Sequence, residues 1–242
     1  MSELILPSEK SKPKINLKEY IILLYGRAKV GKTTLAAQFD SPLFLMFEPG
    51  GRSLELYQIQ MKSWKTFKNS IKALEEKPKE FKTVVLDTID SAYEMCMHYV
   101  CAEMGIDHPQ DEGYGKGWSA VDKEFSNTMS KLGMLNRGVI LISHTKDKDI
   151  EQPDGTIKEM TGPSIANQGM KWVDRNCDLF AYYYYGKNNM RYLRVKGTDN
   201  IVSGNRIENH FIGISKIWAG KSAKETYENF VAAFNNKKVE EK

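Results

Sequence analysis

The sequence contains few of the features that would place it in a specialised class. Its 242 residues include three cysteines, which are too few and odd in number for a disulfide framework. No apolar run approaches the roughly 20 residues that span a membrane, and the first residues contain no secretory apolar core. We therefore expect a reducing compartment, the cytoplasm, and no membrane partner.

A strong excess of charge of one sign is also lacking. The formal net charge is +4, with 27% charged and 41% hydrophobic residues, which is ordinary for a globular protein and permits nucleic-acid binding without requiring it. Internal repeats and long linkers are lacking as well. We expect one α/β domain over residues 19–220, a flexible lead-in over residues 1–18, and a helix with a charged tail over residues 221–242. The apolar patch at residues 4–6 is either part of a frayed tail or a docking segment.

What the sequence does contain is a complete phosphate-binding motif. Residues 26–33 match G-x-x-x-x-G-K-[ST], after an apolar run and before a helical pattern. The glycines let backbone N–H groups turn toward a phosphate, and the start of the helix adds its dipole. Lys32 is expected to reach the β- and γ-phosphate oxygens and Thr33 to bind Mg²⁺. The predicted nucleotide-binding residues are Gly26, Arg27, Ala28, Lys29, Val30, Gly31, Lys32, Thr33 and Thr34.

Three apolar runs each end in a polar residue that suits this chemistry. Glu48 follows the run at residues 43–47, Asp87 follows a β-branched run, and His144 follows residues 138–143. Open α/β sheets bind ligands at the carboxyl ends of their strands. Asp87 has the form of a Walker B acid and is the second predicted Mg²⁺ residue. Taken alone, Glu48 and His144 also fit ordinary solvated loop residues.

A group of cysteine and histidine residues could suggest a zinc site. Cys96, His98, Cys101 and His108 fit no standard ligand spacing. Because Cys96 and Cys101 lie five residues apart on an expected helix, we predict buried thiols instead.

Two long polar segments interrupt the apolar pattern. We expect residues 105–117 and 146–170 to be loops, and loops of this length are usually functional or disordered. Strands are expected at residues 178–185 and 190–196 around a turn. The tyrosines of the first strand could stack on bases, although alternating sheet packing explains most of that run. Helices are expected at residues 63–76, after residue 89, at 121–135 and at 221–234.

In this order the motifs resemble the core of RecA-like ATPases. The resemblance covers residues 20–211, and its most specific segments are GRAKVGKTT, FEPGGRSLEL, TVVLDTIDSAYE and LISHTK. It points above all to the short phage-encoded RecA-like recombination proteins of the single-strand annealing type. The resemblance implies a P-loop NTPase fold, in which helices flank a mostly parallel central sheet, with a C-terminal β-hairpin. It also implies ATP as the nucleotide and, for a phage-encoded protein, the host cytoplasm.

The resemblance assigns roles to the residues at the strand ends and to the two polar segments. Glu48 would polarise the attacking water, and His144 would be the polar sensor of the γ-phosphate. The polar segments would line a DNA path, where Tyr114 or Trp118 could stack on bases and four lysines could meet phosphates. These lysines are Lys116, Lys146, Lys148 and Lys158.

RecA-like proteins also complete the active site in trans, within rings or filaments. Their relatives carry a Lys-x-Arg pair near the end of the core, and the nearest match here is Gly204-Asn205-Arg206. Arg206 fits, the lysine is absent, and Lys196 is the candidate substitute. The resemblance therefore implies a homo-oligomer with Lys196 and Arg206 as additional catalytic residues. Either Lys196 substitutes for the missing lysine, or the trans contribution is weaker.

Three functions are open at this point. The first is an ATP- and Mg²⁺-dependent ATPase that binds DNA, preferably single-stranded, in recombination, replication or repair, with a single-strand DNA-binding protein as a candidate partner. The second is a nucleotide-switched interaction module with little turnover. The third is a small-molecule kinase, which would need an arginine-rich lid that the sequence after Asp87 does not offer.

Overall fold

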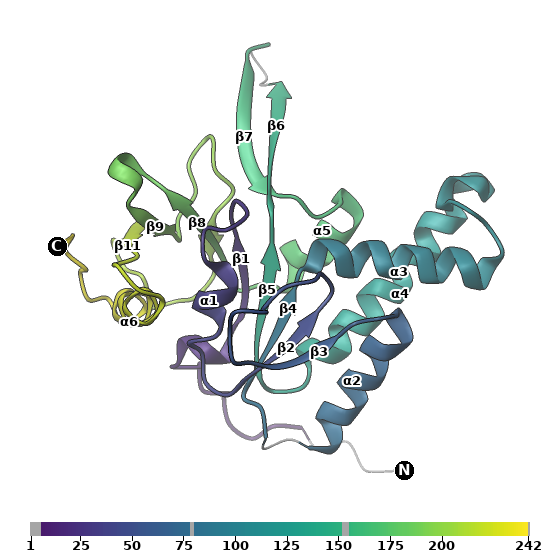
Figure 1. The fold of residues 1–242 in the computed structure, drawn as a ribbon, viewed down its shortest axis with the longest axis horizontal. Helices are drawn as coiled ribbons and strands as arrows, with labels where there is room; N and C mark the ends of the chain where they lie inside the picture. The colour runs from purple at the N-terminus through teal and green to yellow at the C-terminus, as the bar shows by residue number, and fades with distance from the viewer. Residues whose placement is uncertain (1–5, 78–79, 152–154, 242) are drawn as a thin grey trace.

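A nine-stranded sheet forms the centre of the computed structural model, which describes residues 6–77, 80–151 and 155–241 (Figure 1). The strand order is β11-β9-β8-β1-β5-β4-β2-β3, and β10 pairs with β8. A separate hairpin of β6 and β7 projects beyond the edge of this sheet.

The inner part of the sheet is parallel. It consists of β1 (Ile21–Tyr25), β2 (Pro42–Met46), β3 (Tyr57–Gln60), β4 (Thr83–Asp87), β5 (Gly138–Ser143) and β8 (Leu179–Tyr185). Three short antiparallel strands complete it, namely β9 (Arg191–Arg194), β10 (Gly204–Asn205) and β11 (Lys216–Trp218). Strands β1, β2, β4 and β5 are nearly continuous apolar runs because helices cover both of their faces.

Successive residues of the strands point into two helical layers. Leu23 belongs to the cluster under α2 (Trp64–Glu76), α3 (Ile89–Met104), α4 (Lys116–Gly133) and α5 (Asn167–Asn176). Its neighbour Ile22 belongs to the cluster under α1 (Lys32–Ala36) and α6 (Ala223–Phe234). The predicted fold class, a mostly parallel sheet flanked by helices, is confirmed.

Polar residues fix where several helices begin. Ser63, Thr88 and Ser222 each accept a hydrogen bond from the backbone N–H three residues ahead, at the starts of α2, α3 and α6. Such caps satisfy N–H groups that lack a partner in the first helical turn. The helices expected at residues 63–76, after residue 89 and at 221–234 are present, and the helix expected at 121–135 begins earlier, at Lys116.

The expectation of a structureless loop at residues 146–170 was wrong. This segment contains β6 (Thr145–Glu151), β7 (Ile157–Pro163) and the start of α5, and the two strands pair in antiparallel register over their whole length. The hairpin is polar because it projects into solvent. The alternation with a period of two residues that is typical of a strand is therefore an alternation of charged side chains and not of apolar ones. Residues 152–154 lie outside the described part of the chain.

The segment at residues 105–117 is a short connection with little freedom. It contains two 3₁₀ turns, Pro109–Asp111 and Gly113–Gly115, and α4 begins at Lys116. Gly117 packs tightly on Pro109, because a Cβ at Gly117 would lie 2.3 Å from the Pro109 carbonyl oxygen. Three short strands were not expected: β10 and β11 contain two and three residues, and all four residues of β3 are exposed.

Both ends of the described chain contact the core. A 3₁₀ turn at Leu17–Glu19 buries Leu17, and α6 buries Phe230 and Phe234 in the same cluster. Most of the apolar patch at residues 4–6 lies outside the described residues, and Leu6 is exposed. Within the described residues, no helix is both long enough and apolar enough to cross a membrane.

Candidate active site

The phosphate-binding motif forms a tight loop between β1 and α1. Two of its residues, Lys29 and Gly31, have positive φ angles of 64° and 108°. Gly26 is required for another reason, since a Cβ there would lie 2.1 Å from the Tyr183 carbonyl oxygen. The glycines thus allow the close turn on which a phosphate cradle depends.

Lys32 lies in the mouth of this loop. Its side chain is buried, and its ammonium group donates hydrogen bonds to the carbonyl oxygens of Gly26 at 2.7 Å and Arg27 at 3.0 Å. Burial lowers the pKa of Lys32, and the nearby acids Asp87, Asp90 and Glu48 partly oppose that change. The cation is therefore held ready at the position where the motif needs positive charge.

Thr33 and Asp87 meet on the other side of the loop. The Thr33 hydroxyl donates a 2.7 Å hydrogen bond to Asp87 Oδ2. Burial raises the pKa of Asp87, Glu48 raises it further, and the hydrogen bond from Thr33 lowers it. A hydroxyl and a carboxylate are hard oxygen donors of the kind that Mg²⁺ prefers, so this pair fits the cation.

Glu48 follows β2 and is fixed by three side chains. Its Oε1 accepts hydrogen bonds from the hydroxyls of Thr88 and Ser91, and its Oε2 lies 3.4 Å from His144 Nε2. Burial raises the pKa of Glu48, but the hydrogen bonds from Thr88, Ser91 and His144 outweigh it and the pKa is lowered. The carboxylate is therefore ionised at neutral pH and oriented by its neighbours.

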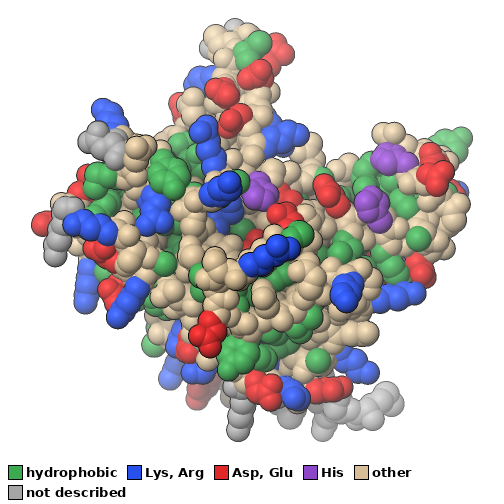
Figure 2. Space-filling view, in the orientation of Figure 1, with side chains coloured by type: hydrophobic (Ala, Val, Ile, Leu, Met, Phe, Trp, Pro, Cys, Tyr) green, Lys and Arg blue, Asp and Glu red, His purple; other side chains and the backbone are tan. Residues whose placement is uncertain are grey.

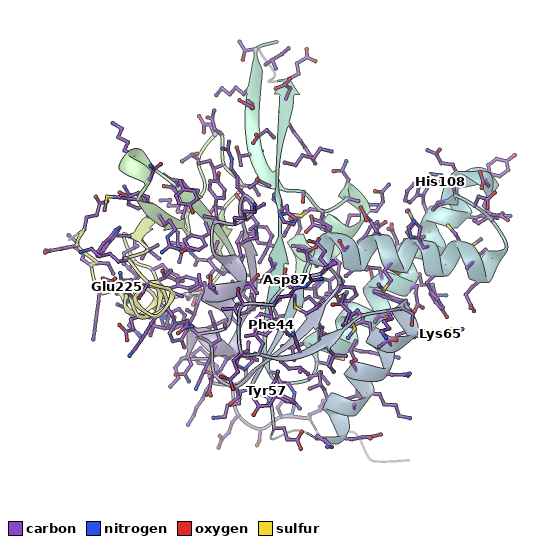
Figure 3. All side chains as sticks on the ribbon, viewed as in Figure 1. Phe44, Tyr57, Lys65, Asp87, His108 and Glu225 are labelled. Carbon is purple, nitrogen blue, oxygen red and sulfur yellow. The ribbon has the colours of Figure 1, made fainter. Side chains whose placement is uncertain are left out.

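These residues surround one cavity of about 370 Å³. Its lining includes Lys32, Thr33, Glu48, Asp87 and His144. Figure 3 shows Asp87 near the middle of the molecule, at the end of the central strands. In Figure 2, basic, acidic and histidine side chains lie side by side in the same region. The structure thus brings together residues that are up to 112 positions apart in the chain, from Lys32 to His144.

Asp90, in the first turn of α3, was not among the site residues predicted from the sequence. Its Oδ1 accepts hydrogen bonds from the hydroxyls of Ser143, at 3.0 Å, and Ser164. Its Oδ2 is buried and has no hydrogen-bond partner among the described residues. Burial raises the pKa of Asp90. The sequence feature that could have indicated Asp90 is its position three residues after Asp87. At that position the first turn of α3 faces the carboxyl end of the strand.

Arg191 was also missed. It lies on β9, and its Nη1 is 3.5 Å from the Val30 carbonyl oxygen, beside the phosphate loop. Its guanidinium group lies 5.9 Å from the centre of the Tyr183 ring. No local sequence pattern indicates this contact, because it depends on the pairing of β9 with β8.

Two predicted catalytic residues lie elsewhere in this chain. Arg206 follows β10, and its Nε donates a 3.1 Å hydrogen bond to Asp178 Oδ1, at the amino end of β8. The phosphate loop lies at the opposite end of the parallel strands, their carboxyl end. Lys196 follows β9 and is exposed. The role of both residues toward a neighbouring subunit stays a prediction, and Arg206 would have to leave Asp178 to fulfil it.

The four predicted DNA-binding lysines separate into two groups. Lys146, Lys148 and Lys158 lie on the hairpin, whereas Lys116 begins α4 in the α3–α4 corner. His108 of that corner lies far from Asp87 in Figure 3. Tyr114 is fully exposed there, and Trp118 contacts the His108 ring at 5.5 Å.

The register of the hairpin sorts its charges by face. Side chains directly opposite each other share a face, and alternate residues point to opposite faces. A basic face therefore carries Lys146, Lys148 and Lys158 together with Ile150 and Met160. An acidic face carries Asp147, Asp149, Glu151 and Glu159, and it places Asp149 opposite Glu159. The hairpin at the top of Figure 2 shows both colours of charge.

The three cysteines are free thiols, and all are buried. The prediction of buried thiols for Cys96 and Cys101 is thereby confirmed. Across residues 6–77, 80–151 and 155–241, no group of three or more histidine, cysteine, aspartate or glutamate side chains is arranged to hold a metal ion. Thr33 and Asp87 are therefore the metal-binding candidates in this part of the chain.

The chain is similar in sequence to known proteins. A family model described as AAA domain matches residues 18–207. A relative described as SPbeta prophage-derived uncharacterized protein YorG, from Bacillus subtilis strain 168, is 30% identical over 155 residues. The match covers 61% of this chain and 48% of the relative, so the chain spans about half of that protein's length.

Proposed function

Because the chain belongs to the AAA domain family of P-loop ATPases, we propose that it hydrolyses ATP with Mg²⁺ and couples this reaction to binding of single-stranded DNA. A role in phage-type recombination, replication or repair follows from this proposal. The observation that carries the proposal is the convergence of Lys32, Thr33, Asp87 and Glu48 on one cavity beside the roots of the hairpin.

Lys32 and the loop would bind the triphosphate of ATP. The ammonium group, held by the Gly26 and Arg27 carbonyls, neutralises charge on the β- and γ-phosphates, and backbone N–H groups of the loop add hydrogen bonds. When bound, Mg²⁺ supplies further positive charge to the same oxygens, with Thr33 and Asp87 as the residues that would hold it. Arg191 adds a cation behind the loop.

Glu48 is the residue that would position the attacking water. Its carboxylate is ionised, and Thr88 and Ser91 fix Oε1, so Oε2 is the oxygen available to accept a hydrogen bond from water. His144, 3.4 Å from Oε2, holds that side of the carboxylate in place. An oriented carboxylate beside a bound γ-phosphate is the arrangement that hydrolysis requires.

The hairpin of β6 and β7 is the feature that supports the proposed binding of DNA. Its basic face carries Lys146 and Lys148 on β6 and Lys158 on β7, where Lys158 also lies 3.5 Å from Asp199. Single-stranded DNA is a polyanion that such a face would bind in a salt-dependent way. The acidic face would repel the same strand, so the arrangement favours binding on one side only. The separation of acidic and basic side chains onto two faces cannot be inferred from the net charge of the hairpin, because the four acids and three lysines of its two strands nearly cancel.

The hairpin is connected to the candidate active site both before β6 and after β7. His144 precedes β6 and contacts Glu48, while Ser164 follows β7 and donates a hydrogen bond to Asp90. The His144 carbonyl oxygen also accepts a 2.9 Å hydrogen bond from the Ser164 N–H. A change at the nucleotide would therefore act on the hairpin, and by linkage DNA on the hairpin would act on the nucleotide site.

The test is steady-state ATP hydrolysis by the full chain, with and without single-stranded DNA, at low and moderate salt. We expect DNA to stimulate hydrolysis several-fold, and Lys32→Ala to abolish it. Joint replacement of Lys146, Lys148 and Lys158 by glutamine should remove the stimulation and lower the salt slope of DNA binding by about 2. Joint replacement of Asp147, Asp149 and Glu159 by their amides is the matched control and should keep the stimulation.

A nucleotide-switched module with little turnover is the second candidate. It is favoured by one observation, namely that Arg206 is held by Asp178 within its own chain. In that case ATP would bind tightly, and DNA would change its affinity without changing turnover. Hydrolysis that DNA does not stimulate, with tight ATP binding, would decide for this candidate.

A further inference from the structure

A row of tyrosines leads away from the nucleotide site along β8. Tyr25, Tyr182, Tyr184 and Tyr192 follow one another with ring centres 4.9, 4.9 and 5.8 Å apart, and the rings of Tyr182 and Tyr184 are parallel within 7°. We call this row the tyrosine ladder. Packing explains the burial of Tyr25, Tyr182 and Tyr192, whereas Tyr184 is half-buried and belongs to neither core cluster.

The outer end of the ladder lines a cavity of about 490 Å³. This volume lies within the range of about 300–1,000 Å³ that is usual for small-ligand sites. Tyr184 and Tyr192 form its aromatic wall, and Lys187, Arg194 and Lys216 bring positive charge. The cavity thus joins a flat aromatic surface to a cluster of cations.

Arg194 has a donor at this cavity that no acceptor in the described part of the chain satisfies. Its Nε is buried and has no hydrogen-bond partner among the described residues, although its Nη1 lies 3.4 Å from the Lys196 carbonyl oxygen. A buried donor without a partner costs free energy, so native structures rarely keep one outside a functional site. An anion in the cavity would be attracted by the Arg194 guanidinium group together with Lys187 and Lys216.

A carboxylate of the same chain already occupies part of this site. Glu241, in the C-terminal tail, lies 3.5 Å from Lys216 Nζ and lines the cavity. Lys216 Nζ in turn lies 4.1 Å from the centre of the Tyr192 ring. Burial and a hydrogen bond with Glu241 raise the pKa of Tyr192. The tail therefore places an acid where the cations and the ring meet.

We propose that this cavity binds one nucleotide of single-stranded DNA, with its base against Tyr184 and its phosphate on Arg194 and Lys216, in place of Glu241. The inference rests on the proposed function, because it assigns a second contact to the same DNA. A free phosphate would leave the tyrosine wall unused, and duplex DNA keeps its bases inside the stack. Only an unpaired nucleotide uses both the ring and the cations.

The tail then acts as a competitor of the DNA. Glu241 must leave Lys216 before a phosphate can bind there, so the tail weakens DNA binding until a strand displaces it.

The experiment uses the full chain and a thymidine oligonucleotide that carries one 5-iododeoxyuridine. Irradiation should cross-link the iodinated base to Tyr184, as located by peptide mass mapping. In anisotropy titrations, Tyr184→Leu and joint Arg194→Gln and Lys216→Gln should each raise Kd about tenfold or more. Glu241→Gln should lower Kd about threefold, and Glu240→Gln, the matched control, should leave it unchanged.

Three results would separate the possibilities, provided that thermal unfolding shows the variants to be folded. If DNA binds and depends on the hairpin lysines while Tyr184→Leu and the Arg194 and Lys216 change have no effect, the cavity assignment is overturned and the proposed function stands. If wild-type protein binds no single-stranded DNA, both fail together. If a peptide of residues 235–242 binds the cavity variant as well as wild type, the tail does not compete there and its role as a competitor is overturned.

Discussion

The Thr33 hydroxyl, in the first turn of α1, and the Asp87 carboxylate, at the end of β4, lie 2.7 Å apart in a direct hydrogen bond. The phosphate loop after β1 brings Thr33 to this position, and β4, which is separated from β1 by β5, brings Asp87. Thr33 and Asp87 would hold Mg²⁺, because a hydroxyl and a carboxylate are the hard oxygen donors that this cation prefers, and their hydrogen bond keeps the two groups together.

The first prediction concerns Asp87→Asn. Because burial raises the pKa of Asp87, its ionised form costs folding free energy at neutral pH, and the amide should leave the ligand-free protein equally or more stable. Mg²⁺-dependent affinity for ATP should fall about tenfold, or about 1.4 kcal/mol. The measurement compares thermal unfolding with ATP plus Mg²⁺ against ATP plus EDTA. Thr33→Ser, which keeps the hydroxyl, should retain the Mg²⁺ effect, and an equal loss in both variants would refute the assignment.

The second prediction concerns Glu48→Gln. The amide cannot accept a proton or carry the negative charge that orients water, so turnover should fall by about 10²–10⁴-fold. Affinity for ATP should change little, because Glu48 binds the water and not the phosphates. Turnover is measured under saturating ATP, and affinity by equilibrium titration. The exposed Glu55→Gln serves as control, and a parallel loss of affinity and turnover in Glu48→Gln would contradict the role.

The third prediction is a pH dependence at Asp90. Burial raises its pKa above that of the unfolded chain, so the wild type loses stability as pH rises from the unfolded pKa through the folded one. Asp90→Asn removes this loss. The variant should be more stable than wild type by about 1 kcal/mol at pH 7–8, and the gain should vanish toward pH 4. Denaturant unfolding of both proteins across this range measures it, and a gain independent of pH would point to a cause other than the charge.

Sequence patterns predicted the elements whose signal is local. The phosphate loop is contiguous, and Glu48, Asp87 and His144 each follow a buried strand, so parallel pairing alone brings them to one edge. The hairpin at β6 and β7 was missed because its alternation is Lys-Asp-Lys-Asp and contains no apolar stripe. Its meaning becomes visible only with the register, which sorts the lysines from the acids.

Other features depend on contacts between distant segments. Asp90 gains its importance from Ser143 and Ser164, which reach it from β5 and from the end of β7. The cavity at the tyrosine ladder needs β8, β9, β11 and the tail together. No window of the sequence contains these partners, so spacing and periodicity could not have shown them.

The last prediction concerns the buried Arg137, which ties α2 to the amino edge of β5. Its guanidinium group donates hydrogen bonds to three carbonyl oxygens, those of Phe81, Leu74 at 2.6 Å and Lys77 at 3.0 Å. Leu74 and Lys77 lie at the end of α2, whose carbonyl groups have no partners within the helix and carry partial negative charge. Burial lowers the pKa of Arg137, but the carbonyls compensate the charge.

Arg137→Ala should therefore leave three carbonyls without their donor and lower the free energy of unfolding by about 2–4 kcal/mol. Arg137→Lys should recover only part of this loss, because one ammonium group cannot match the planar geometry of the guanidinium. Denaturant unfolding measures both, with the exposed Arg175→Ala as control. Affinity for ATP should be retained in the folded fraction, because Arg137 precedes β5 at the edge of the sheet opposite the phosphate loop. A loss of ATP affinity without a loss of stability would mean that Arg137 acts on the site itself.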